Sequence, residues 1–204
     1  LSLQKDEQLS AFVAVKSFDP DKCLVMATKQ GTIKKTKLEA YSNPRKAGII
    51  AITLDAGDEL IGAKVVEPRR EVVLITKQGK AIRFPEDQAR EVGRSARGVR
   101  GIRLNKGDEV VSMVIVEPKD TLLTVTRLGF GKRTRVEEYR VQSRGGKGII
   151  NIKVTKRNGE VVAAKTGTDR DEIMLISQEG MVVRCAVKDV RTTGRGSQGV
   201  RLIN

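Results

Sequence analysis

Two phrases recur along this chain with a period of about fifty residues, and this repeat constrains the fold more than any other feature. The first phrase has an apolar run, a polar turn that ends in glycine, and a second run rich in cations. Its glycines are spaced by 48, 50 and 51 residues: Gly31, Gly79, Gly129 and Gly180. The second phrase ends in glycines spaced by 50, 50 and 51 residues: Gly48, Gly98, Gly148 and Gly199. We therefore expect one repeat domain over 1–204, with approximate units 9–54, 59–104, 110–154 and 161–203.

Short apolar runs dominate each unit, with a period close to two, which is typical of strands. Such runs cover 49–54, 60–66, 72–76 and 80–84, and the glycine turns predict hairpins between adjacent runs. Only PEDQAREV and RVEEYR have the pattern of a helical turn. Four short strands in fifty residues predict an all-β, propeller-like or solenoid array of about four small sheets. The end strands are expected either to pair around a ring or to stay as open edges.

The residue types that are missing exclude several classes of function. A chain without histidine has no His-based metal site, no Ser-His triad and no Cys-His pair. Cys23 and Cys185 are too few for a disulfide framework or a four-cysteine zinc site, which fits a reducing cytosol. Aromatic residues make up 3% of the chain, so a stacking platform for single-stranded bases is poorly supplied. No apolar run approaches the ~20 residues of a membrane span, no signal peptide opens the chain, and Leu1 in place of Met indicates a piece of a longer protein.

Two motifs that suggest nucleotide binding or acid–base chemistry are better explained as turns. Gly194, Gly196 and Gly199 spell G-x-G-x-x-G, but the phrase precedes a predicted strand and leaves no room for a βαβ unit. No G-x-x-x-x-G-K-[ST] is present, so the chain has no P-loop. The acidic pairs at 58–59 and 108–109 occupy equivalent positions beside a turn glycine, which favours solvated turns.

The candidate nucleophiles also have a structural explanation. Tyr41 and Tyr139 stand at the position that holds Ala89 and Val190 in the other two units, which predicts packing. Cys185 aligns with threonine or phenylalanine in the other units and is expected to be a small core residue. We expect no catalysis by this chain alone and no metal site.

The cations carry the functional signal. Lys and Arg number 39 against 25 Asp and Glu, which gives a net charge of +14, and the cations recur at matching positions of the repeat. A stripe of this kind neutralises phosphates along a rim without reading bases, whereas the alternative is a merely soluble basic surface. We therefore predict a rim for duplex DNA formed by Lys34, Lys35, Lys37, Arg45, Lys46, Lys80, Arg83, Arg94, Arg97, Lys132, Arg133, Arg135, Arg184 and Arg195.

One glycine phrase is similar to a known sequence box. QSRGGKG resembles the basic box Q-[RK]-R-G-G-[RK]-G of the C-terminal domain of the bacterial DNA gyrase A subunit, with Ser143 in place of a basic residue. The phrases GDELIG, GVRGIRL, GKRTRVEEY and IKVTKRNG are also similar to that domain, so the resemblance covers essentially the whole chain. It marks as a DNA-binding box Gln142, Ser143, Arg144, Gly145, Gly146, Lys147 and Gly148.

The resemblance implies a β-pinwheel, a disc of four-stranded blades that exchange strands with their neighbours. It implies a non-catalytic domain that wraps duplex DNA around a basic perimeter and so directs an ATP-dependent type II topoisomerase toward negative supercoiling. The expected partners are duplex DNA, the rest of the gyrase A subunit, and the gyrase B subunit, in the bacterial cytoplasm with the nucleoid and without a membrane. ATP and Mg²⁺ belong to other domains, so no cofactor is expected in this chain.

The chain departs from the family pattern in two ways. The family domain usually has six blades with the box in the first, whereas this chain has about four repeats and carries its box match in the third glycine phrase. The start of the chain resembles the second blade, so we expect that the first blade and its box are missing. One alternative is the related domain of the topoisomerase IV A subunit, whose box is typically degenerate. Another, of a different class, is a propeller scaffold that binds proteins.

Overall fold

Four β-hairpins, one in each unit, form the framework of the computed structural model, which describes residues 7–203. The glycine turns predicted these hairpins: Gly31, for example, takes a φ of +87° at its turn, a conformation that a side chain disfavours. The hairpins are β1 (Cys23–Thr28) with β2 (Thr32–Lys37), β4 (Glu71–Thr76) with β5 (Lys80–Pro85), β8 (Thr121–Thr126) with β9 (Phe130–Arg135), and β12 (Glu172–Ile176) with β13 (Val182–Ala186).

Two further kinds of strand complete the first three sheets. Inner strands of seven residues pair antiparallel with the first strand of the hairpin just before them in the sequence: β3 (Leu60–Val66) with β1, β7 (Val110–Val116) with β4, and β11 (Val161–Gly167) with β8. Outer strands of two residues skip the hairpin just before them in the sequence and pair with the second strand of the hairpin one unit further back: β6 (Val99–Arg100) with β2, β10 (Ile149–Ile150) with β5, and β14 (Val200–Arg201) with β9.

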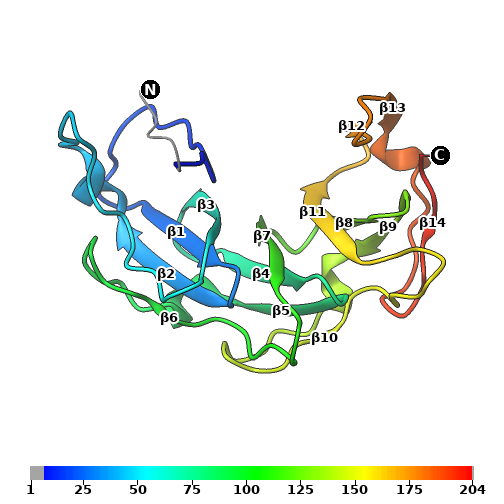
Figure 1. Cartoon of the computed structure of the whole chain (residues 1–204), viewed down its shortest axis with the longest axis horizontal. Coiled ribbons are helices and arrows are strands. Elements are labelled where there is room, and N and C mark those ends of the chain that lie inside the picture. Colours follow the sequence, from blue (N-terminus) through cyan, green and yellow to red (C-terminus); the bar gives the residue numbers. More distant parts are fainter. Residues whose placement is uncertain (1–6, 204) are drawn as a thin grey trace.

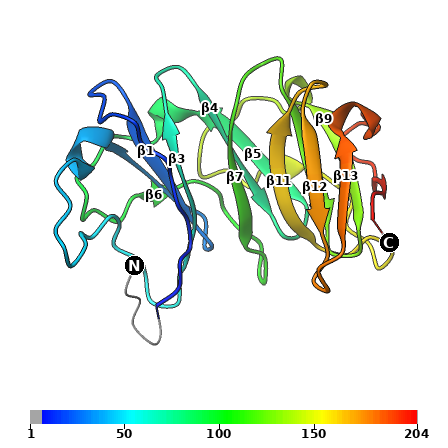
Figure 2. The ribbon, with the colours of Figure 1, turned by 90° about the horizontal axis from the view of Figure 1, so that it is seen from above.

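Each complete sheet therefore borrows its outer strand from the following unit, which confirms the strand exchange implied by the resemblance. The sheet orders are β3-β1-β2-β6, β10-β5-β4-β7 and β11-β8-β9-β14, and within residues 7–203 the fourth sheet has only β12 and β13. Figure 1 shows the sheets along an open arc, with β3, β7 and β11 toward the concave side and β6 and β10 on the convex side. Viewed from above, the sheets stand side by side along the array (Figure 2).

The prediction of a strand over 49–54 is wrong, since this segment has no regular structure. Its counterparts β6, β10 and β14 each pair with a preceding hairpin, and the described residues contain no hairpin before β1. Helical turns are more numerous than the sequence predicted. Besides η2 (Glu86–Gln88) and η3 (Val136–Glu138), which the two helical phrases predicted, the chain forms η1 (Leu38–Tyr41) and η4 (Val187–Asp189), all of the 3-10 type.

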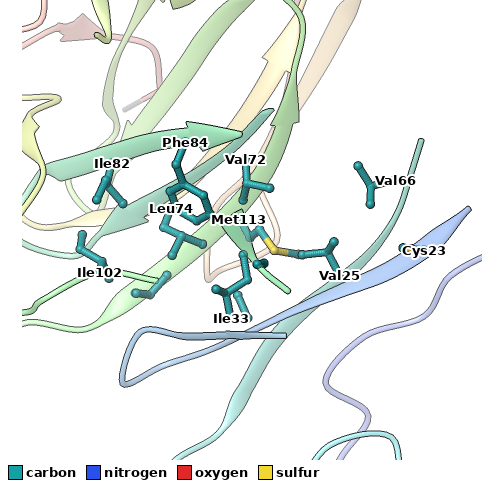
Figure 3. Packing of buried hydrophobic residues seen from close by; sticks show 13 residues of the cluster. Cys23, Val25, Ile33, Val66, Val72, Leu74, Ile82, Phe84, Ile102 and Met113 are labelled. Carbon is teal, nitrogen blue, oxygen red and sulfur yellow. The ribbon is translucent and has the colours of Figure 1, made fainter. Parts of the chain in front are cut away.

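The hydrophobic core lies between neighbouring sheets. Strand β4 is buried on both faces, which explains its continuous apolar sequence. Val72 and Leu74 pack toward the first sheet, and Val73 and Ile75 pack toward the third. Figure 3 shows the first of these layers, a single cluster that joins Val25 and Ile33 of the first sheet with Leu74 and Phe84 of the second. Every unit therefore depends on its neighbours for burial, as expected of a repeat protein.

Tyr139 is buried in the second layer, which confirms its assignment to packing. Its hydroxyl donates to Asn151 Oδ1 at 2.5 Å, and burial raises the pKa of the phenol well above its usual range. Cys185 is only half-buried, and both Cys23 and Cys185 are free thiols. In the acidic turns, Asp58 and Asp108 accept backbone N–H groups of the adjacent hairpin turn at 2.8 and 2.9 Å. No helix in residues 7–203 is long and apolar enough to cross a membrane.

Candidate nucleic-acid interface

The glycine phrases that precede the outer strands form loops held in a row; we call residues 93–98, 143–148 and 194–199 the outer loops. In each outer loop one carbonyl accepts a backbone N–H from the preceding unit. The donor lies three residues after the outer strand of that unit, or after the equivalent residues 49–50 in the first unit. Ala96 O accepts from Thr53 at 3.3 Å, Gly146 O from Arg103 at 2.8 Å, and Ser197 O from Lys153 at 3.0 Å. The same contact thus repeats about every fifty residues and fixes each loop against its neighbour.

The last glycine of each outer loop is required by close packing. A Cβ atom on Gly148 would lie 2.6 Å from Ala81 O of β5, and Gly148 also has a φ of +67°. A Cβ atom on Gly98 would lie at the same distance from Ile33 O, and one on Gly199 at the same distance from Gly131 O. These glycines therefore let the loop lie against the hairpin of the preceding unit.

Five of the predicted rim cations are buried, so their assignment to an exposed rim is wrong. Lys34 and Lys132 are each 1% exposed. Lys132 Nζ donates to Gly194 O and Arg195 O at 2.7 Å each, and Lys34 Nζ donates to Ala51 O at 2.7 Å and to Arg94 O. Burial, with a smaller contribution from a nearby arginine, lowers the pKa of both ammonium groups to about 8.

The other three buried cations, Lys35, Arg83 and Arg133, lie at the next position of the repeat. Each bonds a carboxylate, of Glu86, Glu71 and Asp169 respectively. Arg83 also donates to Val136 O at 2.9 Å and Tyr139 O at 3.0 Å, and Arg133 donates to Val190 O at 3.1 Å. These cations tie a hairpin to the 3-10 turn of the next unit, so they are structural.

The remaining predicted cations differ in how free they are. Arg94, Arg144 and Arg195 are half-buried and donate to carbonyls of the preceding unit. Lys37 donates to Pro20 O at 3.0 Å, and Arg97 and Arg184 pair with Asp55 and Glu172. Within residues 7–203, no ion pair to a carboxylate involves Arg45, Lys46, Lys80, Arg135 or Lys147.

The box segment combines structural and exposed residues. Gln142 N donates to Arg83 O at 2.8 Å, and Gly145 N donates to Gly101 O at 2.6 Å. Ser143 and Lys147 are exposed, whereas Gly146 and Gly148 are half-buried. Lys147 is therefore the box side chain most available to an anion.

Several exposed cations on the outer segments were missed by the sequence analysis. They recur at three positions: after the 3-10 turn, on the outer strand, and three residues after its last residue. The repeat spacing could have found them, because Arg90, Arg140 and Arg191 are 50 and 51 residues apart. Together with Arg97 and Lys147, they define what we call the outer cations: Arg90, Arg97, Arg100, Arg103, Arg140, Lys147, Lys153, Arg191 and Arg201.

The described residues form neither a metal-binding cluster nor a nucleotide-binding loop before a helix. Among residues 7–203, no three His, Cys, Asp or Glu side chains are close enough to hold a metal ion. Gly194, Gly196 and Gly199 lie in an outer loop that leads into strand β14. The repeated feature of this surface is the row of outer cations.

Comparison with protein families gives a match over most of the chain. A family model described as "DNA gyrase C-terminal domain, beta-propeller" matches residues 24–67, 70–117, 120–166 and 171–204. These matches begin each unit at its hairpin, whereas the sequence-based units begin near the inner strand, so the unit boundaries stay a prediction.

Individual proteins give the same picture. The A subunit of DNA gyrase from Halalkalibacterium halodurans is 53% identical over 203 residues, which cover 100% of this chain and 24% of the relative. The chain spans about a quarter of the length of the curated relatives it matches.

Two solved structures resemble the array closely. A DNA gyrase A C-terminal domain superimposes with a TM-score of 0.91 at 28% identity, covering 100% of this chain and 68% of that one. The C-terminal domain of DNA topoisomerase IV gives 0.92 at 24% identity, covering 99% and 64%, a likeness that concerns the fold alone.

Proposed function

Because this chain belongs to the DNA gyrase C-terminal domain family, we propose that it binds and bends duplex DNA along the outer cations on the convex side of the array. The observation that carries the proposal is the recurrence of exposed cations at the same positions of successive units. Phosphates neutralised in this way contribute to affinity without reading sequence. We therefore expect binding that tolerates any sequence.

The shape of the outer segments supports contact with the backbone of DNA. The outer strands are two residues long, and the 3-10 turns are three or four residues long. Reading bases in the major groove takes a helix or a two-stranded ribbon that enters it. Loops and short strands that carry Arg and Lys can instead contact successive phosphates along the DNA backbone.

Bending follows from distributing the contacts over successive units. Curving a stiff duplex over one site costs several kcal/mol, which contacts with a single unit would not offset. The outer cations lie on segments of the second, third and fourth units, and β6 and β10 stand along one convex side (Figure 1). A duplex that follows this side is therefore bent toward the protein.

Within a whole gyrase, we propose that this domain directs the enzyme toward negative supercoiling. Its partners are duplex DNA, the remainder of the gyrase A subunit, and the gyrase B subunit. The domain itself is proposed to be non-catalytic and to need no cofactor, with ATP and Mg²⁺ used elsewhere in the enzyme. The proposed location is the bacterial cytoplasm, with the nucleoid.

The gyrase assignment is favoured over topoisomerase IV by identity in sequence. The relative at 53% identity is the A subunit of a DNA gyrase, whereas the topoisomerase IV structure shares 24% of its residues with this chain. The box match QSRGGKG, with its intact GGKG, points the same way.

A salt titration of affinity for a duplex of mixed sequence tests DNA binding. Each neutralised phosphate contributes about −0.9 to the slope of log K against log salt, so about five contacts give a slope near −4.5. A flat salt response, or a preference above about tenfold for one sequence, would refute the proposal. A scaffold that binds proteins should show little affinity for the duplex at any salt concentration.

A matched pair of double variants locates the surface. Arg103→Ala with Lys153→Ala removes two charges from the outer segments, and we expect the slope to fall by about 1.8. Lys64→Ala with Lys165→Ala removes two exposed charges from the inner strands β3 and β11, and we expect the slope to stay unchanged. Equal losses in the two double variants would show that net charge, and not the convex surface, determines binding.

A further inference from the structure

One arginine recurs at the same position of every outer loop and reaches back to the preceding unit. The guanidinium Nη1 of Arg94 donates to Ile50 O at 2.9 Å, that of Arg144 to Arg100 O at 3.1 Å, and that of Arg195 to Ile150 O at 3.0 Å. The acceptors lie 50 residues apart along the chain. These contacts join successive units at the outer edge of the array.

Arg144 is the most extensively bonded of the three. Its Nε donates to Gln88 O at 2.7 Å, and its backbone N–H donates to Gln88 Oε1 at 2.8 Å. Gln88 ends the 3-10 turn η2 of the preceding unit. Arg144 thus bridges the box loop to both the 3-10 turn and the outer strand β6, and two of its guanidinium nitrogens are already engaged by the protein.

The box loop also lacks a support that the other two outer loops have. Lys34 donates to Arg94 O, and Lys132 donates to Gly194 O and Arg195 O, from below their loops. The equivalent residue below the box loop is Ile82, an apolar side chain whose Cδ1 lies 3.5 Å from the place of a Cβ on Gly146. No ammonium group reaches the box loop from this position, so Arg144 and Gln88 carry more of its attachment.

We propose that Arg144 is a positioning residue, which sets the angle between the second and third units and so the curvature offered to DNA, while Lys147 provides the phosphate contact of the box. The inference rests on the proposed function for its DNA part, but the attachment of the loop is a property of the free protein. The resemblance to the basic box treats the two cations alike, whereas the geometry separates them.

Three single variants of the full chain, with a fourth as a control, distinguish the roles. Arg144→Lys keeps the charge but cannot bridge Gln88 O and Arg100 O together, because a lysine has one nitrogen in place of a fork. Gln88→Ala removes one partner of Arg144 without changing any charge, and Gln78→Ala, at an exposed hairpin turn, is its control. Lys147→Ala removes the exposed cation of the same loop.

Hydrogen exchange of the free protein reports on the attachment of the loop. We expect the amides of Arg144 and Gly145 to exchange about tenfold faster in Arg144→Lys and Gln88→Ala, and unchanged in Gln78→Ala and Lys147→Ala. Unchanged exchange in both Arg144→Lys and Gln88→Ala would overturn the positioning role. This result is independent of DNA, so it stands even if the proposed function fails.

Binding to a duplex labelled at both ends reports on contact and curvature separately. Arg144→Lys and Gln88→Ala should keep the salt slope and reduce end-to-end energy transfer, whereas Lys147→Ala should lower the slope by about 0.9. Full energy transfer in Arg144→Lys, with a slope that falls by about 0.9 in Arg144→Ala, would make Arg144 a phosphate ligand and overturn the inference. No duplex binding by the unmodified chain would instead refute the proposed function.

Discussion

Raising the pH from about 8 to about 10.5 should stabilise the fold through Lys132, and replacing this lysine by methionine should remove the effect. Lys132 is 1% exposed, and its burial lowers the pKa to about 8 from the ordinary value of 10.5. Glu138 opposes this change and Arg195 adds to it, so burial remains the main cause.

The sign follows from the protons held by each state. Between pH 8 and 10.5 the unfolded chain keeps the proton on Lys132 while the folded chain loses it, so the free energy of unfolding rises with pH. At about 1.36 kcal/mol per pH unit, the full difference amounts to about 3.4 kcal/mol. We expect about 2 kcal/mol, because the carbonyls that face Nζ belong to a loop in contact with water.

Urea denaturation of the unmodified chain and Lys132→Met at about pH 7.5, 9 and 10.5 measures the effect. Lys34, Cys23 and Tyr139 titrate equally in both proteins, so their contributions cancel in the difference between the two free energies. The unmodified chain should gain about 2 kcal/mol relative to Lys132→Met across this range. A difference that stays constant or shrinks as the pH rises would refute the assignment of Lys132 as a buried ammonium group.

Two further substitutions test the packing between sheets and the approach of the outer segments. Phe84→Ala should cost about 3–5 kcal/mol of unfolding free energy in urea, because it empties the layer between the first two sheets, whereas Phe12→Ala, at a side chain 87% exposed, should cost less than about 0.5 kcal/mol. Gly79→Ala should cost more than about 2 kcal/mol, since its Cβ would lie 2.3 Å from Ile152 O, while Gly180→Ala, at a similar φ but with open space around it, should cost about 1 kcal/mol. Similar losses for Phe84→Ala and Phe12→Ala, or for the two glycine variants, would contradict the packing described.

Most of the fold was predictable because each unit repeats its own local signals. The hairpin turns and the strands at 60–66, 72–76 and 80–84 follow from glycine spacing and alternation. The partner of an outer strand does not follow from them: period and pattern are the same whichever hairpin β6 joins. Only an exchange of strands between neighbouring blades was expected, and from the resemblance alone. The failed strand at 49–54 shows that an apolar run needs a partner edge to become a strand.

The candidate site was predictable in kind but not residue by residue. Lys34 and Ile82 occupy the same position of the repeat, and both are buried. The sequence alone predicts a solvated side chain for a lysine within a run of cations. The carbonyls that accept from Lys34 Nζ come from Ala51 and Arg94, which are 17 and 60 residues away in the sequence. No local pattern contains that information. Tyr139 was assigned correctly because alanine and valine at its position left no role but packing.

The borrowed outer strands give the nascent chain a fixed order of assembly on the ribosome. Ile33 of β2 cannot pair until Val99 of β6 has been synthesised, 66 residues later and after the whole β4–β5 hairpin. At about 5–20 residues per second, the outer edge of β2 stays unpaired for roughly 3–13 seconds, and it is open to wrong partners during that time. Each later sheet repeats the delay. Slow codons placed just before an outer strand would therefore leave the preceding sheet, and not the one being translated, incomplete for longer.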